Sequence, residues 1–157
     1  LRNGLQLSRK LELDPEKPIL HITSTLTNMI KEPVTASLRS HPEFAVTSTE
    51  QANVRILGPD GKWRTINLAN PADPKAERDQ WLRDSEMPQG AWAVVDEPAG
   101  LAVLNRFDQA AVACALLNRA GHQSRVNLEL FGKELSLKPG ESLTLKQSLE
   151  VTQPDKL

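Results

Sequence analysis

Apolar and polar residues alternate along much of this chain, and this alternation limits its fold more than any other feature. Between Leu5 and Leu13, leucines at positions 5, 7, 11 and 13 are separated by mostly polar residues. A period of two is typical of a β-strand that buries one face. Further stretches that we interpret as strands are Leu20–Thr27, Val34–His41, Ala52–Ile56, Trp63–Leu68, Ala91–Val95, Leu101–Phe107, Val126–Leu130 and Leu143–Val151. Turns rich in Gly and Pro separate many of them, which predicts an all-β, antiparallel β-sandwich.

Length and charge set the domain number and exclude some partners. A chain of 157 residues is long enough for one hydrophobic core and short for two, so we expect a single β-sandwich domain over residues 1–157. The 19 basic and 20 acidic residues give a net charge of −1, which provides no field to attract nucleic acid or an anionic membrane. No apolar run approaches the roughly 20 residues of a membrane span. We therefore expect neither nucleic acid nor a membrane as a partner.

The alternation stops between Asn70 and Gly90, where three prolines and alternating charges take its place. Proline is tolerated in the first turn of a helix, so a short helical turn between Pro74 and Asp84 is compatible with this composition. The main prediction for the stretch is a solvated connector that Trp81 holds to the domain.

The stretch Val34–Phe44 combines an alternating strand with the sequence His-Pro-Glu-Phe. A loop of hairpin length separates it from Leu20–Thr27, so we expect the two stretches to pair as a hairpin. Their polar faces would then lie side by side as one hydrogen-bonding surface. In the predicted register the opposed residues are Thr27 and Thr35, Thr25 and Ser37, Thr23 and Arg39, and His21 and His41.

Short motifs occur at two places along the chain. Leu-Thr-Asn at Leu26–Asn28 precedes His-Pro-x-Phe at His41–Phe44, and the later strand Val126–Leu130 is followed by Leu-x-Pro-Gly-Glu at Leu137–Glu141. Together these motifs resemble the galactose mutarotase (aldose 1-epimerase) group of large β-sandwich domains, which also occur in glycoside hydrolases and sugar-binding proteins.

The resemblance implies a β-sandwich of the mutarotase-like supersandwich type, either in full or as its C-terminal part alone. Family members usually carry an N-terminal half with an Asn-Arg pair and a second histidine, and no part of this chain matches that half. The resemblance also bears on Asp108–Ala120, an Ala/Leu-rich stretch with Asp108 as a helix N-cap and Gly121 as a stop. Following the fold context, we predict a strand over Val112–Asn118 in place of a helix.

Several chemistries lack their motifs in this sequence. It has no Cys/His spacing typical of zinc, no glycine-rich phosphate loop and no G-x-S-x-G elbow, so we expect no metal and no cofactor. A sugar site needs hydrogen-bonding groups for hydroxyls and an aromatic face for the ring. Trp63, Trp81 and Trp92 are the tryptophans that qualify as platforms, although tryptophans more often pack in a core, and we assign Trp63 to the site.

For a catalytic member, the resemblance implies a histidine that protonates the ring oxygen and a glutamate that takes the proton from the anomeric hydroxyl. His41, in the His-Pro-x-Phe motif, matches the family's pocket histidine. Glu129 precedes the Pro-Gly-Glu turn, as the family's base does, and is our choice of base; Glu43 is the rival carboxylate. A structural role for His41, as a hydrogen-bond partner across strands, is the alternative. The residues that we assign to substrate binding are Arg39, Arg125, Asn127 and Trp63.

Three functions remain open on the sequence alone. The first is a carbohydrate-binding or carbohydrate-processing domain, as an accessory domain of a glycan-active enzyme, with a sugar or glycan as its partner. The second is an aldose epimerase or mutarotase that uses the histidine acid and glutamate base, and the third is a structural β-sandwich module without a ligand. If other domains or a second chain complete the sandwich, we expect an exposed apolar surface or an open sheet edge.

Overall fold

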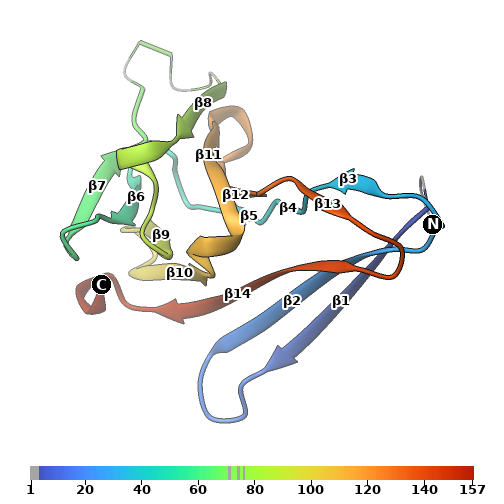
Figure 1. Cartoon of the computed structure of the whole chain (residues 1–157). Helices are drawn as coiled ribbons and strands as arrows, with labels where there is room; N and C mark the ends of the chain where they lie inside the picture. The colour runs from blue at the N-terminus through green and yellow to red at the C-terminus, as the bar shows by residue number, and fades with distance from the viewer. Residues whose placement is uncertain (1–3, 71, 74, 76) are drawn as a thin grey trace.

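The structure is a computed structural model, and it describes residues 4–70, 72–73, 75 and 77–157. Its strands form a seven-stranded sheet, a five-stranded sheet and a separate two-stranded ribbon (Figure 1). Every strand pair is antiparallel, which confirms the predicted all-β antiparallel fold class. Among the described residues, no helix has the length and apolar character to cross a membrane.

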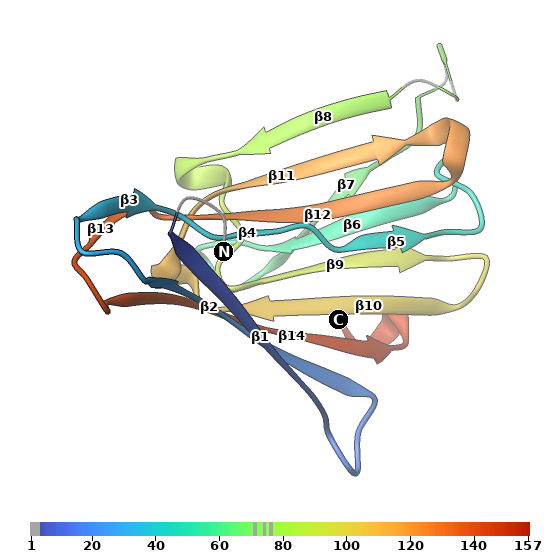
Figure 2. The same ribbon diagram turned by 90° about the vertical axis from the view of Figure 1, so that its right-hand side faces the viewer.

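The seven-stranded sheet has the strand order β1-β2-β14-β10-β9-β6-β7, so the start and the end of the chain meet in it (Figure 2). Thr25 and Thr27 on β2 hydrogen-bond through their side chains to Thr144 and Ser142 on β14. The strands of this sheet are β1 (Leu5–Leu13), β2 (Ile19–Asn28), β6 (Ala52–Leu57), β7 (Trp63–Asn67), β9 (Ala91–Asp96), β10 (Leu101–Phe107) and β14 (Ser142–Thr152).

The five-stranded sheet has the order β4-β12-β11-β8, and β5 also pairs with β12. Beside it, β3 and β13 form the two-stranded ribbon. Short 3-10 turns connect some of the strands, for example at Gln109–Ala111, where the Asp108 side chain accepts a hydrogen bond from the Ala110 N–H. The bounds are β3 (Val34–Ala36), β4 (Arg39–Ser40), β5 (Glu43–Ala45), β8 (Glu77–Leu82), β11 (Val112–Ala120), β12 (Arg125–Gly132) and β13 (Leu135–Leu137).

The hydrophobic core lies between the two sheets. Ile56 on β6 and Val94 on β9 face it from the seven-stranded sheet, and Leu128 and Leu130 on β12 face it from the five-stranded sheet. Successive side chains of a strand point to opposite faces, so each of these strands contributes every second residue to the core. Full burial of a side chain of this size stabilises a fold by about 1.5–3 kcal/mol.

The seven-stranded sheet extends beyond the five-stranded sheet at one end. We call this end, formed by β1 and β2, the overhang; its loop end projects away from the two layers (Figures 1 and 2). On β1, Leu7, Leu11 and Leu13 are 55%, 59% and 79% exposed. Among the described residues, β1 pairs with β2 and with no other strand. The open edge and the exposed apolar row expected of a partial sandwich are therefore present in the overhang.

The predicted hairpin between Leu20–Thr27 and Val34–His41 is wrong. β2 pairs with β1 and β14, and the second stretch is broken into β3 and β4, which pair with β13 and β12. The predicted register is therefore absent, and His21 does not face His41. His21 Nε2 instead lies 4.0 Å from the Asp14 carboxylate, at the loop end of the overhang.

Asn28 explains why the chain leaves the seven-stranded sheet at the end of β2. Its buried side-chain amide donates to the backbone carbonyls of Glu32 (2.8 Å) and Leu137 (2.9 Å), and its oxygen accepts from the Ile30 N–H (3.0 Å). These bonds hold the connecting loop against the β13 side of the molecule. A two-strand hairpin is thereby replaced by a crossover into the ribbon, a change that the alternation pattern does not encode.

Two ambiguous stretches take strand conformation. Val112–Ala120 forms β11, as predicted from the fold context. Between Asn70 and Gly90, the prediction of a solvated connector is wrong in part, because Glu77–Leu82 forms β8, the edge strand of the five-stranded sheet. The predicted helical turn is absent over those residues, and a 3-10 turn follows at Asp84–Glu86. Pro74, where that turn would have begun, lies outside the described residues.

Candidate functional site

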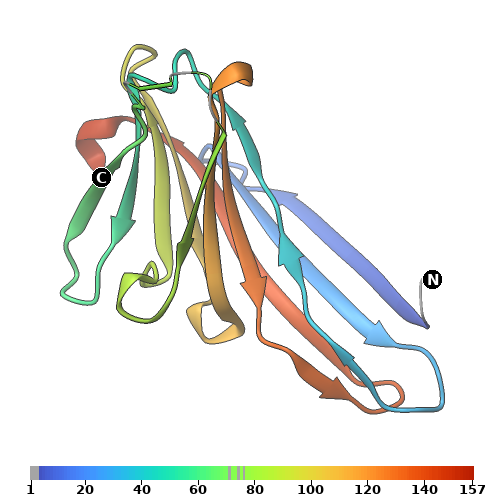
Figure 3. The ribbon, with the colours of Figure 1, turned by 90° about the horizontal axis from the view of Figure 1, so that it is seen from above.

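The candidate site lies on the outer face of the five-stranded sheet, opposite the core. Because Val126, Leu128 and Leu130 point into the core, the alternate residues of β12 point outward. Neighbouring strands add their own outward residues in register. Figure 2 shows β8, β11, β12 and β5 side by side in this sheet, and Figure 3 shows from above how β1 and β2 extend away from it. The outward row of β12 consists of Arg125, Asn127, Glu129 and Phe131.

Glu129 is the centre of a charged cluster on this face. Its side chain is 3% exposed, and Nε of Arg39 donates to Oε2 at 2.7 Å. A second guanidinium nitrogen of Arg39 also contacts Oε2. On the other side, Nε2 of His41 lies 3.2 Å from Oε1 of Glu129. Both carboxylate oxygens therefore have a partner, which a buried carboxylate requires.

The backbone around Ser40 brings Arg39 and His41 to Glu129. Ser40 pairs with Leu130 on β12, and its hydroxyl accepts a 2.6 Å hydrogen bond from the amide of Gln147 on β14. Gly132 permits the close approach of this segment, since a Cβ there would lie 2.9 Å from the carbonyl oxygen of Leu38. The two polar side chains that flank Ser40 in sequence thus reach the outer face beside Glu129.

Aromatic rings continue the cluster toward β8. The Arg39 guanidinium lies 5.0 Å from the centre of the Phe131 ring, and Phe131 lies 5.0 Å from Trp81, centre to centre. Trp81 is 43% exposed. The guanidinium of Arg83 lies 5.2 Å from the Trp81 ring centre. Trp81, Phe131, Arg39, Glu129 and His41 therefore form one continuous surface, which we call the Trp81–His41 strip.

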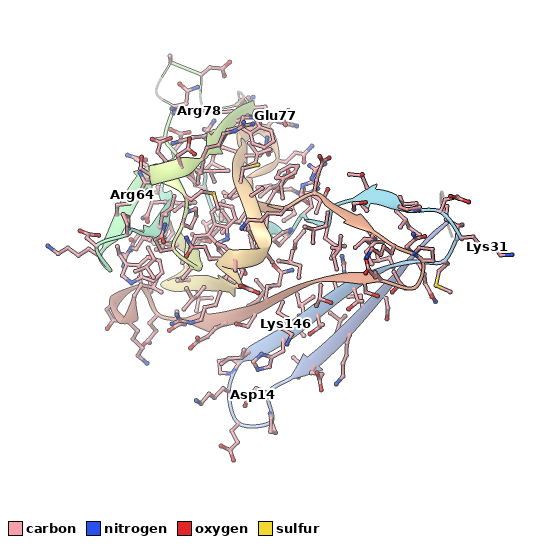
Figure 4. All side chains as sticks on the ribbon, in the orientation of Figure 1. Asp14, Lys31, Arg64, Glu77, Arg78 and Lys146 are labelled. Atoms are coloured by element: carbon pink, nitrogen blue, oxygen red, sulfur yellow. The ribbon has the colours of Figure 1, made fainter. Side chains whose placement is uncertain are left out.

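A second polar row runs beside this strip on the same face. Asn127 donates to Oδ1 of Asn118 at 3.2 Å, and Asn118 donates to Asp79 at 2.6 Å and to Glu77 at 3.0 Å. Glu77 belongs to β8 at its start, where Figure 4 labels it beside Arg78. Oδ1 of Asn127 is buried and has no hydrogen-bond partner among the described residues.

The remaining predicted site residues divide between this face and a distant one. Arg125 lies on the same face, where it pairs with Glu43 at 2.6 Å. Trp63, in contrast, packs beside Ala93 and Leu104 on the face of the seven-stranded sheet that points away from the core. The structure thus brings Arg39, His41, Asn127, Glu129 and Arg125 to one sheet face and does not bring Trp63 there.

Several residues of this face lie outside the predicted site. The sequence predicts Trp81 as the anchor of a connector, and it gives no expectation for Phe131, Asn118, Asp79 or Glu77 as site residues. The signal for Phe131 was its parity with Glu129 on β12, two residues apart. Trp81 and Asp79 depend on recognising that Glu77–Leu82 is a strand, whereas Asn118 lies opposite Asn127 on the predicted strand Val112–Asn118.

A hollow of about 150 Å³ borders His41 on its other side. Arg9, Leu11 and Ile22 of the overhang line this hollow, together with Ser40, His41, Pro42 and Gln147. His41 therefore lies between the outer face and the overhang. Over the described residues, no group of three or more His, Cys, Asp and Glu side chains is arranged to hold a metal ion.

Comparisons with known proteins concern the fold. No family model matches the sequence, and no curated protein matches it. Among solved structures, a candidate aldose 1-epimerase from Klebsiella pneumoniae aligns with a TM-score of 0.73 at 16% identity, over 97% of this chain and 48% of that chain. A galactose mutarotase-like protein from Clostridium acetobutylicum aligns with a TM-score of 0.68 at 13% identity, over 95% and 56%. A TPR-domain containing protein from Parabacteroides distasonis gives 0.71 at 13% identity, over 95% and 30%.

At these identities the likeness concerns the fold alone. The chain aligns over nearly its whole length and spans about half the length of the epimerase-like and mutarotase-like structures. The chain therefore has the fold of the galactose mutarotase-like (aldose 1-epimerase) structures, over a part of their length.

Proposed function

We propose that this chain is a carbohydrate-binding domain whose ligand lies on the outer face of the five-stranded sheet, along the Trp81–His41 strip. The fold supports a carbohydrate-related role, since its matches include proteins described as galactose mutarotase-like and as candidate aldose 1-epimerases. The strip is the single observation that supports this location. It joins an exposed aromatic ring to half-exposed cationic and imidazole donors within one surface.

The chemistry of the strip suits a sugar. The C–H face of a pyranose packs on an aromatic ring, while its hydroxyls need fixed donors and acceptors. Trp81 offers the ring, and Arg39 and His41 offer donors whose orientation Glu129 fixes. A sugar that stacks on Trp81 would displace the exposed Arg83 side chain, which has water as an alternative partner.

The contacts that Glu129 makes favour a binding site over a catalytic one. A general base must be free to take a proton from the substrate. Here one oxygen of Glu129 is bonded to Arg39 and the other faces His41, so the carboxylate is engaged before any sugar arrives. The direct His41–Glu129 contact also leaves no gap for a sugar between acid and base. The epimerase function, in which these two residues act on the ring oxygen and the anomeric hydroxyl, is the second candidate because it uses the same pair.

A titration with matched tryptophan variants tests the proposal. The chain is titrated with galactose, glucose, glucuronic acid and short glycans while intrinsic fluorescence and NMR shifts are followed. We expect saturable binding that Trp81→Ala abolishes or weakens at least tenfold, because the ring supplies the stacking face. Trp63→Ala, on the opposite side of the molecule, is the control and should bind like the wild type. If no sugar binds, or if both variants lose binding equally, the strip is not the site.

Replacement of His41 separates binding from catalysis. In a binding domain, His41→Ala should weaken binding by the ~1 kcal/mol of one hydrogen bond, or up to ~3 kcal/mol if a buried partner is left unpaired. Polarimetry on freshly dissolved α-galactose or α-glucose should show no acceleration of mutarotation over buffer. An acceleration that His41→Ala removes would establish the epimerase function in place of pure binding.

A further inference from the structure

The inner face of the overhang, the face that continues the core side of the seven-stranded sheet, has an unusual composition. On β1 it presents leucines at positions 5, 7, 11 and 13, and the paired positions of β2 add Leu20, Ile22 and Leu26. Leu5 and Leu26 pack against the main core, whereas Leu7, Leu11 and Leu13 are largely exposed. An apolar row of this kind on a long edge strand is typical of a surface that another β-layer covers.

Arg9 interrupts this row at its middle. Its Nε donates to the buried hydroxyl of Ser24 at 3.1 Å, which holds the guanidinium over the inner face of β2. Among the described residues, no carboxylate forms an ion pair with Arg9. A layer that covers the leucines also covers this cation, and burying an unpaired charge is costly. The covering layer must therefore supply an anion.

This charge requirement argues against a second copy of the chain as the cover. The inner positions of β1, β2 and the adjoining part of β14 contain Arg9 as their one charged residue and no carboxylate, because Lys10 and Glu12 point to the opposite face. Two overhangs packed face to face would bury two arginines with no anion between them. Charge complementarity thus selects a different partner.

We propose that the overhang is the docking surface for an antiparallel β-layer from another polypeptide segment, with apolar side chains against the leucines and one carboxylate against Arg9. The occupant is a β-layer because the same face of the seven-stranded sheet is already covered by one, the five-stranded sheet, where the core lies. The docked layer would also close the hollow that Arg9 and His41 both line. The proposal concerns the overhang and does not depend on sugar binding.

A pair of peptide probes tests the charge requirement. The probe is a disulfide-cyclised β-hairpin with alternating valines on one face and a single aspartate at the centre of that face; the matched probe has lysine there. Cyclisation is needed because an isolated hairpin is marginally stable. We expect the aspartate probe to bind at least about tenfold more tightly than the lysine probe. Arg9→Glu should reverse the preference, and Lys10→Glu, one residue away on the opposite face, should leave it unchanged. Both side chains are exposed, so neither variant threatens folding.

Sedimentation of the chain alone provides the second measurement. We expect no discrete dimer for the wild type and increased self-association for Arg9→Leu, because that variant removes the buried-charge penalty. Leu11→Thr in the Arg9→Leu background should reverse the association, whereas Leu135→Thr on the two-stranded ribbon should not. The proposal is overturned if neither probe binds, if both bind equally to the wild type, or if the wild type forms a dimer that Leu11→Thr dissociates. The last result would assign the surface to a second copy.

Discussion

The two ends of the seven-stranded sheet carry the same kind of apolar row and bury it to opposite extents. Ile56 on β6 and Val94 on β9 face the five-stranded sheet and are 0% and 3% exposed. Leu11 and Leu13 on β1 lie on the same side of the same sheet and are mostly exposed. Alternation therefore shows which face of a strand is apolar, and the position of the second layer determines whether that face is buried.

β9 and β1 also differ on the face that points away from the core, and the sequence of each strand predicts this difference. Ala91 and Ala93 of β9 are buried on the outer face as well, beside Trp63. On β1 the corresponding outward residues include Lys10 and Glu12, which form an exposed ion pair at 2.8 Å. A strand that carries such charges belongs at a solvated edge, whereas the charge-free run Ala91–Val95 suits the centre of a sheet.

The largest predicted effect concerns the part of the seven-stranded sheet that the five-stranded sheet covers. Ile56→Ala removes a fully buried side chain from between the sheets and should lower the free energy of unfolding by about 2–5 kcal/mol. Urea denaturation followed by tryptophan fluorescence measures this change. A loss below about 1 kcal/mol would mean that the two layers are not packed as described.

The next prediction concerns Asn28, which links the overhang to the rest of the molecule. Asn28→Ala removes three hydrogen bonds at a buried position and leaves the Leu137 carbonyl without its donor. We expect a loss of about 1–3 kcal/mol in the free energy of unfolding. Thr65→Ala, at an exposed position on β7, is the control and should change stability by less than about 0.5 kcal/mol. An equal effect of the two variants would contradict a structural role for the crossover.

Leu11→Ala is the counterpart of Ile56→Ala at the uncovered end. The side chain is 59% exposed, so its truncation should change the free energy of unfolding by less than about 0.5–1 kcal/mol in the isolated chain. The same urea experiment gives the comparison directly. A loss comparable to that of Ile56→Ala would show that the overhang is already covered in solution.

The smallest effect belongs to Asp14, at the loop end of the overhang (Figure 4). The backbone N–H of Glu16 donates to its carboxylate and holds the pKa of Asp14 below its ordinary value of 3.8, with help from the N–H of Lys17. A lowered pKa in the folded state means that the stabilisation is present above the unfolded-state pKa and is lost as the pH falls through the folded-state value. The stability difference between wild type and Asp14→Ala should therefore disappear in acid and stay constant near neutral pH. NMR titration of the Asp14 carboxyl checks the direction.

Much of the strand content was predictable because alternation is a local property. β1, β9, β10, β12 and β14 lie where the pattern places them, and the strand over Val112–Asn118 was predictable from the fold resemblance. The partner of each strand was less predictable, because pairing depends on the loops. The Asn28 hydrogen bonds that send the chain across to β3 involve Leu137, more than a hundred residues later.

The site residues show the same limit. His41 and Arg39 approach Glu129 across the β4–β12 pair, which was not predicted. The resemblance to the mutarotase group led to His41 and Glu129, and the role of these residues in binding stays a prediction. Trp81 was not predicted as a site residue, because the charges at Glu77, Arg78 and Asp79 make its segment resemble a loop. A short edge strand with polar residues on both faces has no period-two signal to detect.

The neighbours of β2 also determine how the protein can fold. β2 lies between β1, which directly precedes it, and β14, where Ser142 contacts Thr27 from 115 positions along the chain. Contacts between residues so far apart in sequence raise the contact order, and such topologies fold slowly because a long loop must close before the contact forms. On a ribosome β1 and β2 emerge well before β14, the strand that joins them to the sandwich. Until β14 has paired with β2, the leucine row of the overhang lies outside the sandwich, and this is the period in which a chaperone or a docking segment has most to gain by binding it.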